Sequence, residues 1–350
     1  MKSKVKKLSA IDLFSGCGGL TVGLKQAGFR VLAAIEIDRK AQETYAANHR
    51  DVSLIRQDIR KVSGKELLKK LNLKFGELDL LAGCPPCQGF SMMRTRNQKS
   101  SVSDHRNDLI HEFSRLIEAL SPKTIMLENV PGLSADVRFS QFCRKLKRLG
   151  YKHSFGVHDA ADYGLPQRRK RLLLLASKVD VPILPQPDSI RSTVRATFHN
   201  LPKAGLSGDP LHDLPERRSA HVQEIIRNIP QDGGSRAQLP QELMLECHKR
   251  SDGFRDVYGR MSWDDVAPTI TGGCFNPSKG RFLHPEEDRC ITLREASLLQ
   301  GFPSKYRFDV THGKESIALM IGNALPPPFI KAHACALNRH LKKQLEAASN

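Results

Sequence analysis

The 350-residue sequence lacks any apolar run that approaches the roughly 18 residues of a transmembrane helix. Its first residues, MKSKVKKLSAIDLF, also lack the longer apolar segment and the cleavage site of a secretory signal. These two absences argue against a membrane-spanning protein. We expect a cytoplasmic protein that has no membrane partner.

Acidic residues are scarce relative to basic ones. The chain holds 37 Asp and Glu against 55 Lys and Arg, which gives a formal net charge of +18 at pH 7. A field of this sign attracts polyanions and raises the rate at which they meet the protein. Nucleic acid is therefore the first partner that we expect.

Cysteine is sparse as well, with eight residues spread between Cys17 and Cys335. This spacing is the opposite of a small scaffold held by disulfides, so we expect reduced thiols. The sequence shows no internal repeat and no low-complexity tract. Its composition, 39% hydrophobic and 26% charged, is typical of a globular protein, and its length predicts two unequal lobes.

Short β-rich runs alternate with helical periods in the first half of the chain. We expect strands in AIDLF, VLAAIEI, LDLLAG, TIMLE and KRLLLLAS, with a further short strand before QDIR. We expect helices over residues 20–27, 39–49, 65–71, 109–120 and 141–149. This alternation predicts parallel βαβ units and therefore an α/β fold.

After Ser177, prolines and glycines come at close spacing and little periodicity remains, which predicts a loop-rich second lobe. Helical periodicity returns at residues 292–299 and again from residue 315, where the last segment ends in a long amphipathic helix. The predicted boundaries are 1–178, 179–313 and 314–350, and we expect the last segment to pack back on the first lobe.

A glycine-containing loop, DLFSGCGGL, joins the first predicted strand to the first predicted helix. Its glycines at Gly16, Gly18 and Gly19 allow positive φ angles and let a ligand approach the backbone closely, as in nucleotide-binding loops. Thr21 stands where the third glycine of G-x-G-x-x-G would be, which disfavours a hydride-transfer cofactor. A tight turn without a ligand is the alternative.

Two carboxylates follow the next strands. Glu36 lies at a strand end about 20 residues after the loop, where an acidic side chain can accept hydrogen bonds from ribose hydroxyls. Asp58, in QDIR, could serve an adenine amino group in the same way. For both residues the alternative is a solvated carboxylate at a strand end, and nothing in the sequence separates the two interpretations of Asp58.

Two cysteines, Cys84 and Cys87, lie in GCPPCQGFS after the strand LDLLAG, at the edge where open α/β sheets bind ligands. A redox pair would need a helix start, whereas the adjacent prolines favour an extended loop. Half of a zinc site would need further ligands nearby, and these are lacking. A nucleophilic thiolate fits the cations Arg94, Arg96 and Lys99, which can lower a thiol pKa and lie along a phosphate backbone.

Glu128, in LENV, ends the next strand, so its carboxyl should lie beside the Cys87 loop as a candidate acid or hydrogen-bond donor. A strand-terminal carboxylate that caps the following turn is the alternative. The run QRRKR is either a solvated charge run or a basic patch that binds phosphates. Because alternate residues of a strand share one face, Arg169 and Arg171 should point to the same side.

Taken together, these motifs resemble the DNA (cytosine-5) methyltransferase family, in its bacterial type. The family's signatures stand here in order as DLFSGCGGL, IEID, QDIR, GCPPCQGFS, LENV, QRRKR, TLREASLLQGFP and GNALPP. The stretch from Val179 to about Arg260 matches no signature, as is typical of the family's variable target-recognition region. A large N-terminal regulatory region is also lacking, which favours the bacterial type.

The resemblance implies an S-adenosylmethionine-dependent methyltransferase fold, that is, a Rossmann-like mixed sheet with helices on both faces and a small loop-rich recognition domain. The first segment would be catalytic and cofactor-binding, and the middle one would recognise the target. No metal is implied. The residues implied to bind S-adenosylmethionine are Phe14, Gly16, Gly18, Glu36, Asp58, Pro85 and Asn323. The residues implied to contact DNA are Gln88, Ser91, Arg94, Arg96, Arg106, Thr271 and Gly272.

The resemblance further implies the reaction. Cys87 would add to C6 of a cytosine flipped out of double-stranded DNA, which activates C5 for methylation. Glu128 would contact the cytosine edge, Arg169 and Arg171 would steady the base and the catalytic loop, and Cys84 would be structural. A cognate restriction endonuclease is an expected partner, and a monomer is the expected state.

Two other functions and one other loop interpretation stay open. A tRNA-acting relative typically carries Cys-Phe-Thr near the catalytic loop, which is absent here. A catalytically inactive DNA-binding subunit would not need Cys87, Glu128 and Arg169 together. The TITGG segment with Thr271 and Gly272 resembles a recognition loop whose small residues approach the groove, and a simple glycine turn is its alternative.

Overall fold

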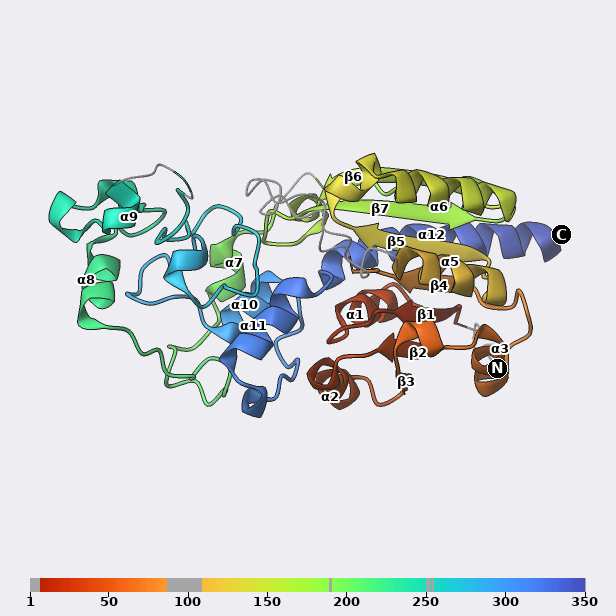
Figure 1. Ribbon diagram of the computed structural model, residues 1–350, viewed down its shortest axis with the longest axis horizontal. Helices are drawn as coiled ribbons and strands as arrows, with labels where there is room; N and C mark the ends of the chain where they lie inside the picture. Colours follow the sequence, from red (N-terminus) through yellow and green to blue (C-terminus); the bar gives the residue numbers. More distant parts are fainter. Residues whose placement is uncertain (1–6, 87–108, 189–190, 250–252, 254, 350) are drawn as a thin grey trace. The chain divides into compact units, whose positions relative to one another are not determined.

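We analysed a computed structural model of the chain, which describes residues 7–86, 109–188, 191–249, 253 and 255–349 (Figure 1). The chain divides into two compact units. The first unit comprises Met1–Ala160, Lys170–Pro187 and Leu325–Asn350, and the second comprises Ala161–Arg169 and Asp188–Ala324. The sequence-based boundaries at residues 178 and 314 therefore differ from the structural ones.

The first unit contains a seven-stranded sheet with the order β3-β2-β1-β4-β5-β7-β6. β1 to β5 pair in parallel, whereas β7 runs antiparallel to both β5 and β6. The strands are β1 Ser9–Leu13, β2 Arg30–Glu36, β3 Ser53–Arg56, β4 Leu80–Gly83, β5 Thr124–Asn129, β6 Lys152–Asp159 and β7 Lys170–Ser177. All predicted strands are present, and the expected α/β fold with a mixed sheet is confirmed.

β6 was not predicted from the sequence. It lies at the edge of the sheet and pairs only with β7. Its apolar residues are therefore largely exposed, with Phe155 at 48% and Val157 at 47%. A strand whose apolar side chains face solvent lacks the continuous apolar run by which the other strands were recognised.

Helices cover both faces of this sheet (Figure 1). One face packs against α3, α5 and α6 through residues such as Leu13, Leu67, Phe113, Leu127 and Phe142. The other face carries α1 and α2, and α12 packs on α1. The bounds are α1 Gly19–Gln26, α2 Arg39–Asn48, α3 Gly64–Leu71, α5 Leu109–Leu120, α6 Val137–Arg148 and α12 Pro327–Ser349.

The helix predicted at residues 141–149 begins earlier, at Val137. Asp136 caps it, because its carboxylate accepts a hydrogen bond of 2.8 Å from the backbone N–H of Arg138. Short 3-10 turns occupy Ile59–Lys61, Pro131–Ala135, Ala160–Tyr163, Arg236–Gln238, Gln241–Leu243, Pro277–Lys279 and Val310–His312. Among the described residues, no helix has the length and apolar character that crossing a membrane requires.

The second unit is rich in loops and held by short helices, as the sequence predicted. These helices are α7 Val194–Phe198, α8 Ala220–Asn228, α9 Glu246–Lys249, α10 Leu293–Leu299 and α11 Lys314–Asn323. α11 belongs to this unit, and the chain returns to the first unit at Leu325. The run of prolines that starts at Pro326 separates α11 from α12, because a proline disfavours helical geometry in the residue before it.

The contact between α1 and α12 depends on two glycines one helical turn apart. A Cβ atom on Gly23 would lie 2.6 Å from the Ile330 Cβ, and one on Gly19 would lie 2.2 Å from the Leu325 carbonyl oxygen. Any side chain at these positions would push the two helices apart. The glycines therefore let the last helix lie directly on the first.

We predict that Gly23→Ala destabilises the protein although alanine has the higher helix propensity. Overpacking of a tight contact costs about 1–3 kcal/mol, whereas the propensity gain is about 1 kcal/mol at most. Thermal unfolding of the variant should show a lower midpoint. Gln26→Ala, at an exposed position of the same helix, should leave the midpoint nearly unchanged, and equal midpoints for both variants would contradict the role of Gly23.

Candidate active site

The glycine loop after β1 has a backbone that only small or strained residues adopt. Phe14, Gly16 and Gly18 have φ angles of 61°, 54° and 105°, which lie in the left-handed region. A Cβ atom on Gly16 would meet nothing within 4 Å, so the space above this glycine is open. Gly18 then caps α1. The loop thus leaves open space beside Gly16, and the binding of a ligand there stays a prediction.

Glu36, at the end of β2, is bound to this loop. Its carboxylate accepts hydrogen bonds from the backbone N–H groups of Gly16 at 2.7 Å, Ile37 at 2.8 Å and Asp38 at 2.7 Å. Partial burial raises the pKa of Glu36, and these hydrogen bonds oppose the rise. The structure therefore brings together Gly16 and Glu36, two of the residues that sequence reasoning singled out.

Asp58 follows β3 at the same edge of the sheet. Its carboxylate caps a 3-10 turn by accepting from the Arg60 backbone N–H at 3.0 Å, and it pairs with the Arg60 guanidinium at 2.5 Å. The hydrogen bonds with Arg60 hold the pKa of Asp58 below its ordinary value. These contacts match the strand-end interpretation of Asp58 and keep the carboxylate ionised.

Glu128, at the end of β5, carries the central carboxylate of the carboxyl edge. Its side chain is only 2% exposed, and the Arg171 Nε of β7 lies 3.0 Å from its Oε1 atom. The thiol of Cys84, directly after β4, donates a hydrogen bond of 2.8 Å to its Oε2 atom. A buried carboxylate is stable only when it is paired in this way.

The next residue, Asn129, holds the same loop. Its side-chain amide donates a hydrogen bond of 2.9 Å to the carbonyl oxygen of Pro85, and its own amide oxygen accepts from the backbone N–H of Val130 at 2.8 Å. Glu128 and Asn129 therefore contact two successive residues of the cysteine loop. This explains why LENV and GCPPC belong to one site.

Arg169 belongs to the second unit and directs its guanidinium to backbone carbonyl oxygens of that unit. It is nearly buried and donates to the carbonyl oxygens of Ile270 at 3.0 Å and Gly322 at 2.8 Å. The prediction that Arg169 and Arg171 share one side is not supported, because β7 begins at Lys170 and the strand alternation does not include Arg169. Arg171 lies within the strand and contacts Glu128.

Gln167, fully buried, holds the same segment of the second unit. Its side-chain oxygen accepts from the Ile270 backbone N–H at 2.9 Å, and its nitrogen donates to the Leu299 carbonyl oxygen at 3.1 Å and to Gln300 at 2.8 Å. Gln300, equally buried, donates to the Ala324 carbonyl oxygen at 2.5 Å. Three signatures, QRRKR, LLQGFP and GNALPP, are thus joined through buried amides.

The backbone of the TITGG segment is closely packed, whereas the side chain of Thr271 is exposed. A Cβ atom on Gly322 would lie 2.3 Å from the Thr271 carbonyl carbon and 2.4 Å from the Gly272 nitrogen, so α11 lies directly against this peptide. The side chain of Thr271 is exposed. This arrangement packs the backbone of the segment tightly and leaves the Thr271 side chain exposed, and its contact with DNA stays a prediction.

The comparisons with known proteins agree with this geometry. A family model for C-5 cytosine-specific DNA methylases matches residues 8–339, nearly the whole chain. The chain belongs to the C-5 cytosine-specific DNA methylase family. Members of this family use S-adenosylmethionine, and this methylase is a DNA (cytosine-5) methyltransferase.

Bacterial relatives resemble the methylase over almost their full length. Type II methylase M.HgiDII of Herpetosiphon aurantiacus is 39% identical over 95% of this chain and 96% of its own. Type II methyltransferase M1.HphI of Haemophilus parahaemolyticus is 32% identical over 94% of this chain and 86% of its own. The crystal structure of an Escherichia coli prophage DNA modification methyltransferase matches with a TM-score of 0.69 and 26% identity, covering 96% and 99% of the two chains.

Several residues that the sequence assigned to the methylase's site are not located by the structure. Those outside the described residues are Cys87, Gln88, Ser91, Arg94, Arg96 and Arg106. Asn323 is the last residue of α11, in the second unit, and its side chain is exposed. Pro85 is among the described residues, and its carbonyl oxygen accepts a hydrogen bond from the Asn129 side-chain amide.

Sequence reasoning missed one buried carboxyl of the methylase. Asp12 is fully buried in β1, where the Thr21 hydroxyl donates to its Oδ2 atom at 2.6 Å, and Thr21 in turn contacts the Tyr45 hydroxyl at 2.7 Å. Burial raises the pKa of Asp12 to about 8. The sequence signal that could have revealed it is an acidic residue inside an otherwise apolar strand. Where helices cover both faces of a sheet, such a carboxyl is buried and needs polar partners.

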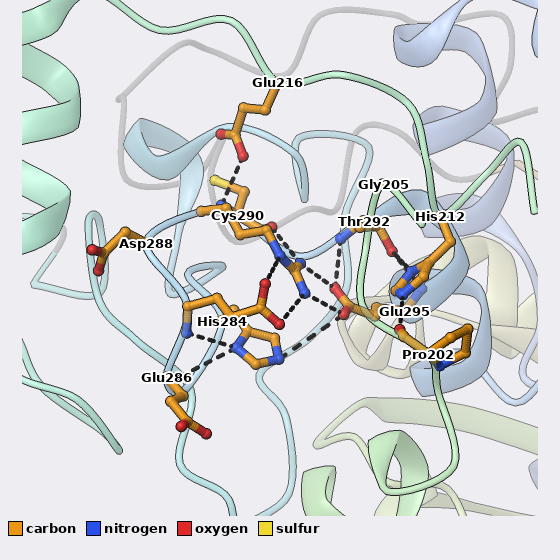
Figure 2. A network of polar contacts seen from close by, with 12 residues as sticks. Pro202, Gly205, His212, Glu216, His284, Glu286, Asp288, Cys290, Thr292 and Glu295 are labelled. Carbon is orange, nitrogen blue, oxygen red and sulfur yellow. Dashed lines mark hydrogen bonds and ion pairs between the residues drawn. The ribbon is translucent and has the colours of Figure 1, made fainter. Parts of the chain in front are cut away.

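A second network of polar contacts stabilises the methylase's second unit (Figure 2). Arg289 bridges Glu295 at 2.8 Å and Glu287 at 3.0 Å, and Glu295 also caps α10 through the Thr292 backbone N–H at 2.7 Å. The Nδ1 atom of His284 accepts the backbone N–H of Glu287 at 3.0 Å. Nδ1 is therefore unprotonated, which leaves the proton on Nε2, 4.0 Å from Glu295.

We predict that acid weakens the second unit through His284. Burial lowers the pKa of this histidine to about 4, whereas an unfolded histidine titrates near about 6.5. Between these pH values the histidine binds a proton in the unfolded chain and does not bind one in the folded chain. The free energy of unfolding therefore falls as the pH drops from about 6.5 towards about 4. Urea unfolding at pH 7 and pH 5 measures this loss.

The matched variants for this prediction are His284→Gln and His111→Gln. The first removes the buried imidazole and should reduce the difference in urea midpoint between the two pH values. The second changes an exposed histidine of α5 and should keep the wild-type difference. If both variants lose the same stability on acidification as the wild type, His284 is not the responsible group.

We also predict that Gly322→Ala disturbs target recognition. The added Cβ cannot fit against the Thr271–Gly272 peptide, so the loop must move by about 1 Å, and a displacement of that size commonly lowers turnover by about 100-fold. Methylation of the preferred sequence should fall relative to other sequences, as read by bisulfite sequencing. Cofactor affinity should not change, and Glu315→Ala, on the exposed part of α11, should retain the wild-type pattern.

Proposed function

We propose that this methylase transfers a methyl group from S-adenosylmethionine to C5 of a cytosine flipped out of a specific sequence in duplex DNA. The observation that carries the proposal is the buried Glu128 carboxylate, held by Arg171 and Cys84 at the carboxyl edge of the sheet. This edge is where open α/β folds bind ligands, and the cysteine loop starts from it.

The cofactor would lie on the glycine loop. The open space above Gly16, the left-handed backbone at Gly18 and the Glu36 carboxylate fit a nucleoside with ribose hydroxyls. Phe14, Asp58, Pro85 and Asn323 would complete the site, as the family resemblance implies. The cofactor supplies an electrophilic methyl group bonded to a sulfonium.

The chain's own residues would activate the cytosine. The Cys87 thiolate would add its electron pair to C6, which breaks the C5–C6 double bond and makes C5 nucleophilic. Glu128, protonated or donating a hydrogen bond to N3, would stabilise the charge that addition pushes into the ring, and Arg171 would hold the Glu128 side chain. After methylation, loss of the C5 proton to water would restore the double bond and release the thiolate.

The second unit would recognise the DNA sequence. Thr271 is exposed on a backbone fixed by Gln167, Arg169 and Gly322, so its position is defined before DNA binds. We propose that Arg169 acts on this loop in addition to the catalytic loop. Flipping the base costs a few kcal/mol. Contacts in the DNA groove and contacts of the basic residues Arg94, Arg96 and Arg106 would offset this cost.

The Type II names of the bacterial relatives support a partner. A restriction endonuclease that cuts the same sequence would require this methylase to protect the host DNA. We propose that the methylase acts as a monomer. Tight, methylation-competent binding of tRNA instead of DNA would favour the tRNA-acting alternative.

The test is to express the enzyme with a plasmid in a host that lacks cytosine methylation and to map 5-methylcytosine by bisulfite sequencing. We expect methylation at one short sequence. Cys87→Ala should abolish it while duplex binding remains, because the thiol acts in the covalent step. Residual turnover above about a thousandth of the wild type, or equal damage from Cys84→Ala, would refute the role of Cys87.

A further inference from the structure

Cys84 faces Glu128 because of the strand register. β4 and β5 pair in parallel, and Gly83 lies opposite Leu127. Cys84 is the next residue after β4, so it comes opposite Glu128. Both residues alternate with Leu81 and Leu127, which belong to the core on the other face, so their side chains lie on the same face of the sheet. The thiol therefore reaches the Oε2 atom at 2.8 Å.

Arg171 approaches Glu128 from β7, which neighbours β5 on the side away from β4. In the antiparallel pair of β5 and β7, Glu128 lies opposite Leu173. Arg171 comes two residues before Leu173 in β7, on the same face, and its Nε atom lies 3.0 Å from Oε1. The Cys84 thiol donates to one carboxylate oxygen of Glu128, and the Arg171 guanidinium forms an ion pair with the other.

We propose that Cys84 is a positioning residue whose thiol orients the Glu128 carboxylate and stabilises its ionised form. This inference rests on the proposed function, in which Glu128 contacts the cytosine. A hydrogen bond donated to the charged form of a carboxyl favours that form, so the thiol and Arg171 act in the same direction. Donation of the Glu128 proton to the base leaves the carboxylate ionised, so a contact that stabilises the ionised form favours that donation.

This role differs from the structural role that the sequence suggested for Cys84. A structural cysteine would contribute packing, which a residue of similar size replaces. A positioning thiol contributes a donor, which only another donor replaces. Serine keeps a hydroxyl donor at this position, whereas alanine and valine do not. The three substitutions therefore separate the two roles.

Other titratable groups face the same side of the sheet. His158 of β6 lies opposite Arg171 and contacts His333 of α12, with ring centroids 5.4 Å apart. Burial lowers the pKa of His333 to about 3, so it stays neutral above that pH. Asp12 of β1 and Glu36 of β2 are carboxyls on this side, and burial raises the pKa of Asp12 to about 8 and that of Glu36 above its ordinary value. These groups would titrate in the same way in every Cys84 variant, so they cannot produce a difference between the variants.

The direct test follows the titration of the Glu128 carboxyl by 13C NMR in the full-length enzyme, with Glu128→Gln to assign its signal. In Cys84→Ala the titration midpoint should rise by about one pH unit relative to wild type. Cys84→Val fills the space and keeps water from replacing the thiol, and it should show the same rise. Cys84→Ser should restore the wild-type midpoint.

Cys143→Ala is the matched control, because it removes a half-buried thiol from α6, on the other face of the sheet. Its Glu128 midpoint should equal that of the wild type. Equal midpoints for wild type, Cys84→Ala and Cys84→Val would overturn the proposal. A rise in Cys84→Ser as large as that in Cys84→Ala would overturn it too, because the donor would then be irrelevant.

Activity provides a second readout. The limb of the pH profile of kcat/KM that belongs to Glu128 should move to higher pH in Cys84→Ala and Cys84→Val and return in Cys84→Ser, with the highest rate lowered less than about tenfold. An enzyme that methylates no DNA at any pH would refute the proposed function. The NMR titration would still decide the role of Cys84, so the two failures are distinguishable.

Discussion

The parallel pairing of β1, β2, β4 and β5 is the constraint on which the first unit's site depends. Parallel strands that enter a sheet from the same side must all end at the same edge. The glycine loop, Glu36, Cys84 and Glu128 each follow or end one of these strands, so one hydrogen-bonding pattern brings them together. β7, the one antiparallel neighbour, begins at this edge and contributes Arg171 from the opposite direction.

The second unit is ordered by a different interaction, the hydrogen bonding of buried side chains to backbone carbonyl oxygens. Arg260 is fully buried and donates to the carbonyl oxygens of Ile226, Ile229, His284 and Glu287. Its guanidinium carries five N–H donors in a fixed geometry, which suits irregular segments that form no ladder among themselves. Arg169 donates to the Ile270 carbonyl oxygen and Gln167 accepts from the Ile270 N–H, so these side chains hold the TITGG segment without a strand.

How far the sequence could predict the fold depended on how each element is buried. Strands covered on both faces, such as TIMLE and KRLLLLAS, are continuous apolar runs and were predicted. β6 has solvent on one side and was missed. The sequence could also place Glu128 and the Cys84 loop at one edge, because strand ends alone determine that. It could not predict the contact of Glu128 with Cys84, because a contact requires the register of β4 against β5.

Arg169 shows a second reason why prediction failed. The argument from alternating residues assumed that the strand includes Arg169, whereas β7 begins one residue later. The direction of the side chain is then decided by carbonyl oxygens of Ile270 and Gly322, which lie far along the chain. No local pattern carries information about such partners. The same holds for Gly322, whose requirement for glycine arises from the peptide that it touches.

The packing of α12 on α1 joins two segments that lie far apart in the sequence. The helix that begins directly after the glycine loop contacts α12 and the residues just before it at Gly19 and Gly23. Contacts between such distant segments require a long loop of chain to close first, so they form late in folding. The helix beside the glycine loop therefore reaches its final packing only when this distant segment has docked.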